Sequence, residues 1–321
     1  MPNQTNLNVA PYFDDFDPSK NFHKVLFKPG YPVQARELTT LQSILQNQVS
    51  QFGQHFFKEG VKVIPGNISF DNNYECILLE NTFQGVPVSA YAEQLIGTKI
   101  TGQRSGVSAY VDKILFPEDS ERGQITLYIN YLDVGSANQQ SATFFDGEQL
   151  VSNETISSGL LNNTTISVGA PFASTLSAAA AQTGSVFHIE EGVYFLRGSF
   201  VNIEKESLLL DQYGSFPNYR VGFFVTEDIV TSDLDESLND NSQGFNNYAA
   251  PGADRLKISA SLFKKPLDNF DDTNFVQLAK FVDGYIESPS KKGELGGGPG
   301  YIDWGDVIAR RTSDELSLIH I

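Results

Sequence analysis

One continuous stretch, Phe27–Phe70, constrains the fold of this chain most, because a helix signal leads directly into a strand signal. From Val33 onward, apolar residues recur with the spacing of one helix face. These apolar positions are Leu38, Leu41, Leu45, Val49, Phe52 and Phe56. The helix signal stops by Gly60, and the β-prone run Val61–Phe70 is interrupted by Pro65-Gly66. The stretch therefore predicts an amphipathic helix followed by a β-hairpin or a sharp β-bend.

The predicted helix has two interpretations. A heptad drawn through its leucines and Phe52 places the polar residue Gln48 in the apolar seam. A polar residue in such a seam fixes the register and the number of associating helices. The helix could instead pack as a single amphipathic element on its own domain, and both interpretations stay open here. If the helix self-associates, the assembly residues are Leu38, Leu41, Leu45, Gln48 and Phe52.

The rest of the chain has mainly the character of β-strands. Short β-prone runs are separated by turn signals, and Gln124–Leu132 shows the clearest alternation of apolar and polar residues. Residues 1–30 are rich in Asn, Asp, Pro and Phe, which predicts an extended arm that lies on another surface. We therefore predict a mainly β (α+β) fold: an N-terminal arm and amphipathic helix followed by two or more small antiparallel β-barrel or β-sandwich modules, elongated overall.

The length of 321 residues indicates two or three domains. We predict an arm plus helix at residues 1–60, a first β module at 61–151, a linker-like segment at 152–185 and a second β module at 186–315. The last six residues, Leu316–Ile321, read LSLIHI, which resembles a translated sequencing adapter. We expect that this tail is an artefact and that the native chain continues beyond it.

Two distant stretches of the sequence share a short pattern, which we call the sequence echo. Glu59-Gly60-Val61 is followed by Gly66, and Glu191-Gly192-Val193 is followed by Gly198. Glycine is favoured where φ is positive or where backbones approach closely, so these glycines are predicted structural turns. The structural-turn residues are Gly60, Gly66, Gly192 and Gly198. The echo indicates two related β modules, with chance similarity of short hairpins as the alternative.

Charge and cysteine content exclude several classes of protein. The net charge of −17 disfavours binding to nucleic acid or to an anionic membrane surface. No apolar run reaches the roughly 20 residues of a membrane span, and the N-terminus lacks a secretory signal, so we expect synthesis in a cytoplasm and no membrane insertion. The single cysteine, Cys76, lies in an apolar strand-like run and is predicted to be a buried, inert thiol.

The sequence contains no convincing catalytic constellation. It has no metalloprotease or nucleophile-elbow motif, and the glycine-rich Gly293–Gly300 lacks the Lys-Ser/Thr pair of a phosphate-binding loop. Carboxylates at Asp233, Asp235 and Asp240 form a weak candidate for Ca²⁺, since alternate oxygen ligands suit that ion. The order of an EF-hand is absent, and a solvated acidic loop is the alternative. We therefore predict no enzyme activity, no cofactor and no established metal site.

Several long segments resemble one known family. They are FDPSKNFHKVLFKPGYPVQARELTTLQSILQNQ, GVYFLRGSFVNI, YRVGFFV, SLNDNSQGFNNYAAPGADRLKI and ARRTSDE. Together they resemble a virion structural protein family of tailed phages, best known from phages of cyanobacteria and largely catalogued as a domain of unknown function. The resemblance extends nearly to Glu315. It implies a tail- or baseplate-associated protein at the root of a fibre, and it supplies no catalytic residues.

These observations lead to one expected function and one alternative. We expect a virion structural protein of the phage tail or baseplate, a fibre-proximal or attachment subunit that forms a homotrimer after synthesis in the host cytoplasm. Its expected partners are other tail or baseplate proteins, and host surface glycans through the missing C-terminal part. The alternative is a carbohydrate-binding or polysaccharide-degrading tail fibre or spike protein, which would require a groove with exposed aromatic residues or a carboxylate pair.

Overall fold

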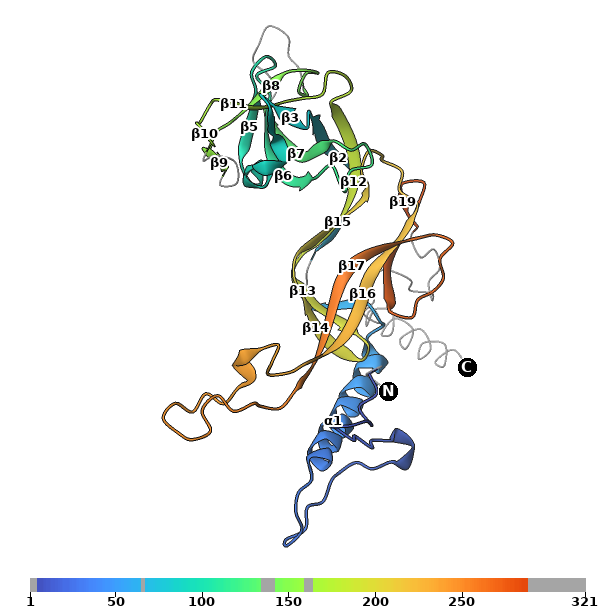
Figure 1. Cartoon of the computed structure of the whole chain (residues 1–321). Helices are drawn as coiled ribbons and strands as arrows, with labels where there is room; N and C mark the ends of the chain where they lie inside the picture. The colour runs from blue at the N-terminus through green and yellow to red at the C-terminus, as the bar shows by residue number, and fades with distance from the viewer. Residues whose placement is uncertain (1–4, 65–66, 134–141, 159–163, 288–321) are drawn as a thin grey trace, which may run out of the picture. The chain divides into compact units, whose positions relative to one another are not determined.

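The computed structural model describes residues 5–64, 67–133, 142–158 and 164–287 (Figure 1). It confirms the predicted fold class: these residues form mainly β-strands, in several antiparallel sheets, and one α-helix. Within these residues the sheets are open and none closes into a barrel. The predicted turn at Gly66, the glycine-rich Gly293–Gly300 and the tail Leu316–Ile321 lie outside the described residues.

The chain forms two compact units. Unit 1 comprises Met1–Ile68, His188–Leu208 and Asn218–Ile321, and unit 2 comprises Ser69–Phe187 and Leu209–Pro217. The domain boundaries predicted at residues 60, 151 and 185 assume that each domain is one continuous segment of the chain. Unit 1 is assembled from three separate segments of the chain. Local sequence patterns do not predict such an association between distant segments.

Unit 2 is built on an eight-stranded sheet with strand order β11-β8-β5-β6-β7-β2-β12-β15. Its strands are β2 (Ile68–Leu79), β5 (Lys99–Gly102), β6 (Ser108–Leu115), β7 (Ile125–Asp133), β8 (Gln149–Ser152), β11 (Pro171–Ser174), β12 (Ala181–Ile189) and β15 (Glu206–Asp211). The remaining elements are β3 (Thr82–Phe83), β4 (Val86–Pro87), η2 (Val88–Ala90), η3 (Ala92–Leu95), β9 (Ile156–Ser158) and β10 (Thr164–Ile166). The two short pairs, β3-β4 and β10-β9, stand outside the main sheet.

Strand β7 lies in the interior of this sheet, which confirms the strand predicted over Gln124–Leu132. Because side chains alternate between the faces of a strand, Ile125 and Leu127 join the main apolar core while Tyr128 joins a second cluster. In that second cluster the rings of Tyr74 and Tyr128 stack with centroids 4.8 Å apart. The sheet is therefore packed on both faces at this strand.

Cys76 is buried in this second cluster, as the sequence predicts. Burial raises the pKa of its thiol to about 12. Because only the thiolate reacts, the folded protein at pH 8 should resist alkylation by iodoacetamide, whereas the chain in urea should react fully. Mass spectrometry of the alkylated protein checks this, and rapid modification of the folded chain would contradict it.

Unit 1 contains two smaller sheets and the only α-helix of the described residues. The strands are β1 (Val61–Ile64), β13 (Gly192–Leu196), β14 (Ser199–Ile203), β16 (Tyr219–Val230), β17 (Arg255–Pro266), β18 (Phe275–Val282) and β19 (Tyr285–Ile286). Their orders are β1-β13-β14 and β17-β16-β18-β19. The helices are α1 (Ala35–Phe56), η1 (Pro18–Lys20) and η4 (Glu236–Leu238). None of the described helices combines the length and the apolar character that a membrane crossing requires.

The two halves of the sequence echo pair with each other in one sheet. β1 and β13 are antiparallel neighbours, with Val61 opposite Phe195 and Lys62 opposite Tyr194. The proposal of two separate related modules is therefore wrong. The hairpin interpretation of Val61–Phe70 is wrong as well, because β1 pairs with β13 while β2 belongs to the sheet of unit 2.

The predicted glycine turns differ in their backbone conformation. Gly60 has φ of +82°, and Gly198 has φ of +74° beside Arg197 at +50°. Two residues with positive φ between paired strands form the two-residue hairpin turn that matches strand twist. Gly198 thus lies in the bend between β13 and β14, while Gly192 is the first residue of β13 and pairs with Ile203.

Candidate assembly surface

Helix α1 is where the predicted assembly residues lie. It begins after Gln34, whose backbone N–H donates to Glu37 Oε2 at 3.0 Å, and it ends at Phe56. This first-turn contact satisfies one of the otherwise unpaired amide groups of the helix. Near the other end, Gly53 is buried against the ring of Phe195. A Cβ added at Gly53 would lie 2.5 Å from that ring, so glycine is what permits this close approach.

The inward face of α1 is made largely of polar and small residues. Ile44 and Ser50 are each 3% exposed. On the same side, the hydroxyls of Thr40 and Ser43 donate to the buried carboxylate of Asp14 in the arm, with Thr40 Oγ1 3.1 Å from Asp14 Oδ1. The helix is therefore attached to its own unit by hydrogen bonds to the arm, by Ile44 and by the packing of Gly53 on Phe195.

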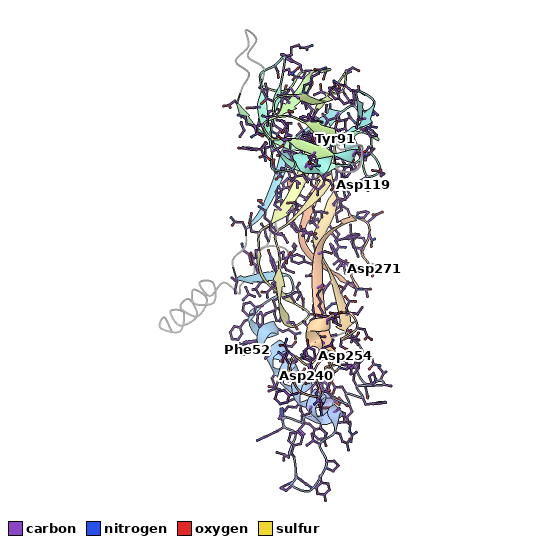
Figure 2. All side chains as sticks on the ribbon, turned by 60° about the vertical axis from the view of Figure 1, so that its left-hand side comes forward. Phe52, Tyr91, Asp119, Asp240, Asp254 and Asp271 are labelled. Atoms are coloured by element: carbon purple, nitrogen blue, oxygen red, sulfur yellow. The ribbon has the colours of Figure 1, made fainter. Side chains whose placement is uncertain are left out.

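The apolar face of α1 points to solvent. We call Leu38, Leu41, Leu45, Val49 and Phe52 the apolar stripe. At about 100° per residue these five positions fall on one side of the helix, opposite Thr40 and Ser43. Leu45 is 58% exposed and Phe52 is 65% exposed, and only Leu41 is half-buried. Phe52 is labelled beside α1 in Figure 2.

The structure thus brings all the predicted assembly residues to one exposed surface. Gln48 is also exposed and flanks the stripe where the heptad places it. An amphipathic helix normally turns its apolar side to the core, and α1 does the reverse. A contiguous exposed apolar surface marks an interaction site, because each leucine or phenylalanine gains roughly 1.5–3 kcal/mol on burial.

The arm holds α1 in this orientation. Besides the bonds to Asp14, Asp15 forms an ion pair of 3.6 Å with Arg36 in the first turn of the helix. Just before these aspartates, Tyr12 donates to Asp254 Oδ2 at 2.5 Å, and this bond raises the pKa of the Tyr12 hydroxyl. The arm therefore connects the helix to the segment that leads into β17.

A buried charge cluster anchors the same region. Arg197 Nη1 lies 3.1 Å from Glu227 Oε1, and both side chains are largely shielded, at 11% and 3% exposure. Arg197 Nη2 also donates to Asn274 Oδ1 at 2.6 Å. The second oxygen of Glu227 accepts from the backbone and hydroxyl groups of Thr5, both at 2.8 Å. Finally, the Arg197 backbone N–H donates to Glu59 at 2.9 Å.

This cluster joins five parts of unit 1 at one point. Its residues come from the start of the arm, the segment after α1, the β13–β14 turn, β16 and the segment before β18. A buried ion pair whose remaining hydrogen-bonding groups are satisfied fixes geometry, and removal of one partner is strongly destabilising. Sequence reasoning did not find Arg197 or Glu227. The one available signal was a charged residue beside a turn glycine, at Arg197-Gly198.

The candidate Ca²⁺ ligands do not converge. Asp235 accepts from the Ser237 backbone N–H at 2.9 Å, and Asp240 accepts from that of Ser242 at 2.8 Å. Hydrogen bonds from the side chains of Ser237 and Ser242, together with these backbone bonds, lower the pKa of both carboxyls. Across the part of the chain that the structure describes, no group of three His, Cys, Asp or Glu is placed to hold a metal ion, and this includes Asp233.

The segment between β16 and β17 is nevertheless ordered by its own contacts. The backbone groups of Asp240 pair with those of Ala249 and Ala250 at 2.9 Å, and Gly252 packs closely on the Leu238 carbonyl. A depression of about 450 Å³ lies in this segment. Its lining is mainly polar and consists of Ser237, Leu238, Asn239, Asp240, Asn241, Asn247, Ala250, Pro251, Gly252 and Arg255. The segment is thus a folded projection.

One buried hydroxyl in unit 1 lacks a partner among the described residues. Tyr194 is fully buried, its ring packs edge-on against Phe223, and its hydroxyl makes no hydrogen bond. An unsatisfied buried polar group costs roughly 1–3 kcal/mol, so Tyr194→Phe should raise the free energy of unfolding by about 1 kcal/mol. Urea denaturation measures this change.

Tyr91→Phe is the matched control for that substitution. The Tyr91 hydroxyl donates to the Phe172 carbonyl at 2.5 Å, so its loss should lower stability by about 1 kcal/mol or more. Equal destabilisation by both substitutions would show that Tyr194 has a partner, such as a bound water.

Comparison with known protein families identifies the family of this chain. The structure defines a mainly β protein with an exposed amphipathic helix. A family described as a domain of unknown function (DUF4815) matches residues 10–105 and 149–315, so the chain belongs to this family. The match covers the arm from residue 10 onward, α1 and most strands of both units. Comparisons with curated proteins and with solved structures gave no significant match.

Proposed function

We propose that this protein is a structural subunit of a phage virion, located in the tail or baseplate near the root of a fibre. In this proposal it has no catalytic activity and assembles as a homotrimer through the apolar stripe of α1. The exposure of that stripe is the observation that carries the proposal, because a helix with this surface is incomplete without a partner. The resemblance of several long segments to a tailed-phage structural family supports the virion setting.

The composition of the stripe favours a second copy of the same chain as its partner. From Leu38 to Gln54 the helix carries no charged side chain, so identical surfaces can approach without repulsion between like charges. In a heptad register, Leu38, Leu45 and Phe52 take the a positions, and Leu41 and Gln48 take the d positions. Two-stranded coiled coils prefer β-branched residues at a, so leucine and phenylalanine there favour a higher order.

The proposed location can be tested on purified phage particles from a host that carries this gene. Proteomics of the particles should detect the chain at a copy number divisible by three, and an antibody against it should label the tail in electron micrographs. If the chain is abundant in infected cells but absent from washed particles, the proposal of a structural subunit is wrong.

A further inference from the structure

Two surfaces of unit 1 other than the apolar stripe expose groups of large apolar side chains. The first is the arm segment, residues 20–31, in which Phe22, Leu26, Phe27 and Tyr31 are 48–73% exposed. The second is the projecting loop, residues 233–248, in which Leu234, Phe245 and Tyr248 are 54–76% exposed. Single exposed apolar residues are common on proteins, but groups of this density mark interaction surfaces.

The two surfaces are opposite in charge. The arm segment contains Lys20, Lys24 and Lys28 and no carboxylate, within a chain whose net charge is −17. The projecting loop contains four carboxylates and no Lys or Arg. Those carboxylates are Asp233, Asp235, Glu236 and Asp240. Among the described residues, none of these seven charged side chains takes part in an ion pair.

Contacts within unit 1 hold each of these two surfaces in place. The arm segment lies between Asp14 and Asp15, which contact α1, and the helix itself. The projecting loop is held by the backbone pairing of Asp240 with Ala249 and Ala250, and the bond from Tyr12 to Asp254 fixes the segment that follows the loop. Figure 1 shows the arm turning at η1 on one side of α1 while the loop extends on the other. Asp240, within the loop, and Asp254, in the segment that follows it, are labelled in Figure 2.

We propose that the arm segment of one copy of this chain docks on the projecting loop of a neighbouring copy. Complementary charge selects this occupant, and the exposed aromatic and leucine side chains on both sides supply apolar area to bury. A contact between two different patches is heterologous, and a closed ring uses each patch once in every copy. The inference rests on the proposed self-assembly, and it adds a second interface around the α1 contact.

Carbodiimide cross-linking of the wild-type chain is the first test, because it joins a lysine directly to a carboxylate in contact. Mass spectrometry should identify cross-links between Lys20, Lys24 or Lys28 and a carboxylate of the projecting loop. Their yield should fall as salt is raised, since exposed charges are screened. If the chain is oligomeric by light scattering yet forms no such cross-link, the docking proposal is wrong while the α1 interface stands.

A pair of co-expressed variants then separates contact between copies from contact within one copy. One variant carries Lys20→Arg, Lys24→Arg and Lys28→Arg, which keep the charge but do not react. The other carries Asp233→Asn, Asp235→Asn, Glu236→Gln and Asp240→Asn. In complexes isolated through different tags, a cross-link can join only the arm of the second variant to the loop of the first. If the wild type cross-links but this pair does not, the contact lies within one chain and the proposal fails.

Charge reversal provides the quantitative control. The double variant Lys24→Glu, Lys28→Glu should lower the cross-link of the remaining arm lysine, Lys20, at least tenfold, without changing the α1-driven oligomeric mass. Adding Asp235→Lys and Glu236→Lys to the same chain should restore arm–loop cross-linking in the reversed sense. A monomeric wild type would contradict both this proposal and the self-assembly, whereas an unchanged cross-link yield after charge reversal would contradict only the docking.

Discussion

Leu45→Glu should convert the oligomer to monomers at micromolar concentration. Leu45 lies in the centre of the apolar stripe and is more than half exposed in the single chain. Burial of this side chain is worth roughly 2 kcal/mol in each copy, so three copies lose about 6 kcal/mol before the repulsion between the new carboxylates is counted. Because the residue contacts solvent in the single chain, the folding of each unit should change little. Light scattering coupled to size-exclusion chromatography measures the mass.

Gln46→Glu is the matched control for this substitution. It introduces the same charge one residue away, at an exposed position outside the stripe. This variant should retain the oligomeric mass of the wild type, and circular dichroism should show the same secondary structure for both variants. If Leu45→Glu keeps the wild-type mass, the stripe is not the assembly surface. If both variants dissociate, general acidity of the helix rather than the stripe controls assembly.

Arg197→Ala should destabilise unit 1 by about 3–5 kcal/mol. The substitution leaves Glu227, which is 3% exposed, without its cationic partner, and it also removes the bond to Asn274. The cost arises because an uncompensated charge stays buried away from water. Since the cluster holds the start of the arm, the variant should also expose the arm to proteolysis. Urea denaturation and limited digestion are the two measurements.

Replacing both charged partners separates charge from packing. The double variant Arg197→Met, Glu227→Met should recover much of the stability lost in Arg197→Ala, because no unpaired charge is left. Arg36→Ala, which removes an exposed ion pair with Asp15, should cost less than 1 kcal/mol. An Arg197→Ala variant as stable as the Arg36→Ala control would show that Arg197 and Glu227 are not coupled as the structure indicates.

Local patterns in the sequence predict much of the fold. The spacing of the leucines gives α1 with nearly the observed limits, and the alternation of Gln124–Leu132 gives β7. The same spacing gathers the assembly residues on one face of the helix. These predictions succeed because each depends on the periodicity of a single helix or strand. That periodicity can be read from neighbouring residues in the sequence.

The features that local patterns miss depend on contacts between distant residues. The polar face of α1 points inward because Thr40 donates a hydrogen bond to Asp14 of the arm. The arm has no periodicity from which this contact could be predicted. The buried cluster joins Thr5, Arg197 and Glu227, which are far apart in the chain. The pairing of β1 with β13 is of the same kind. The sequence echo predicts two modules because sequence similarity does not distinguish repeated units from strands that pair in one sheet.

The mass of the wild-type protein in solution tests the central claim most directly. If the exposed stripe of α1 is a self-association surface, light scattering at micromolar concentration should give three times the mass of one chain, and the value should fall to one chain mass for Leu45→Glu. A wild-type protein that stays monomeric at these concentrations would contradict the account.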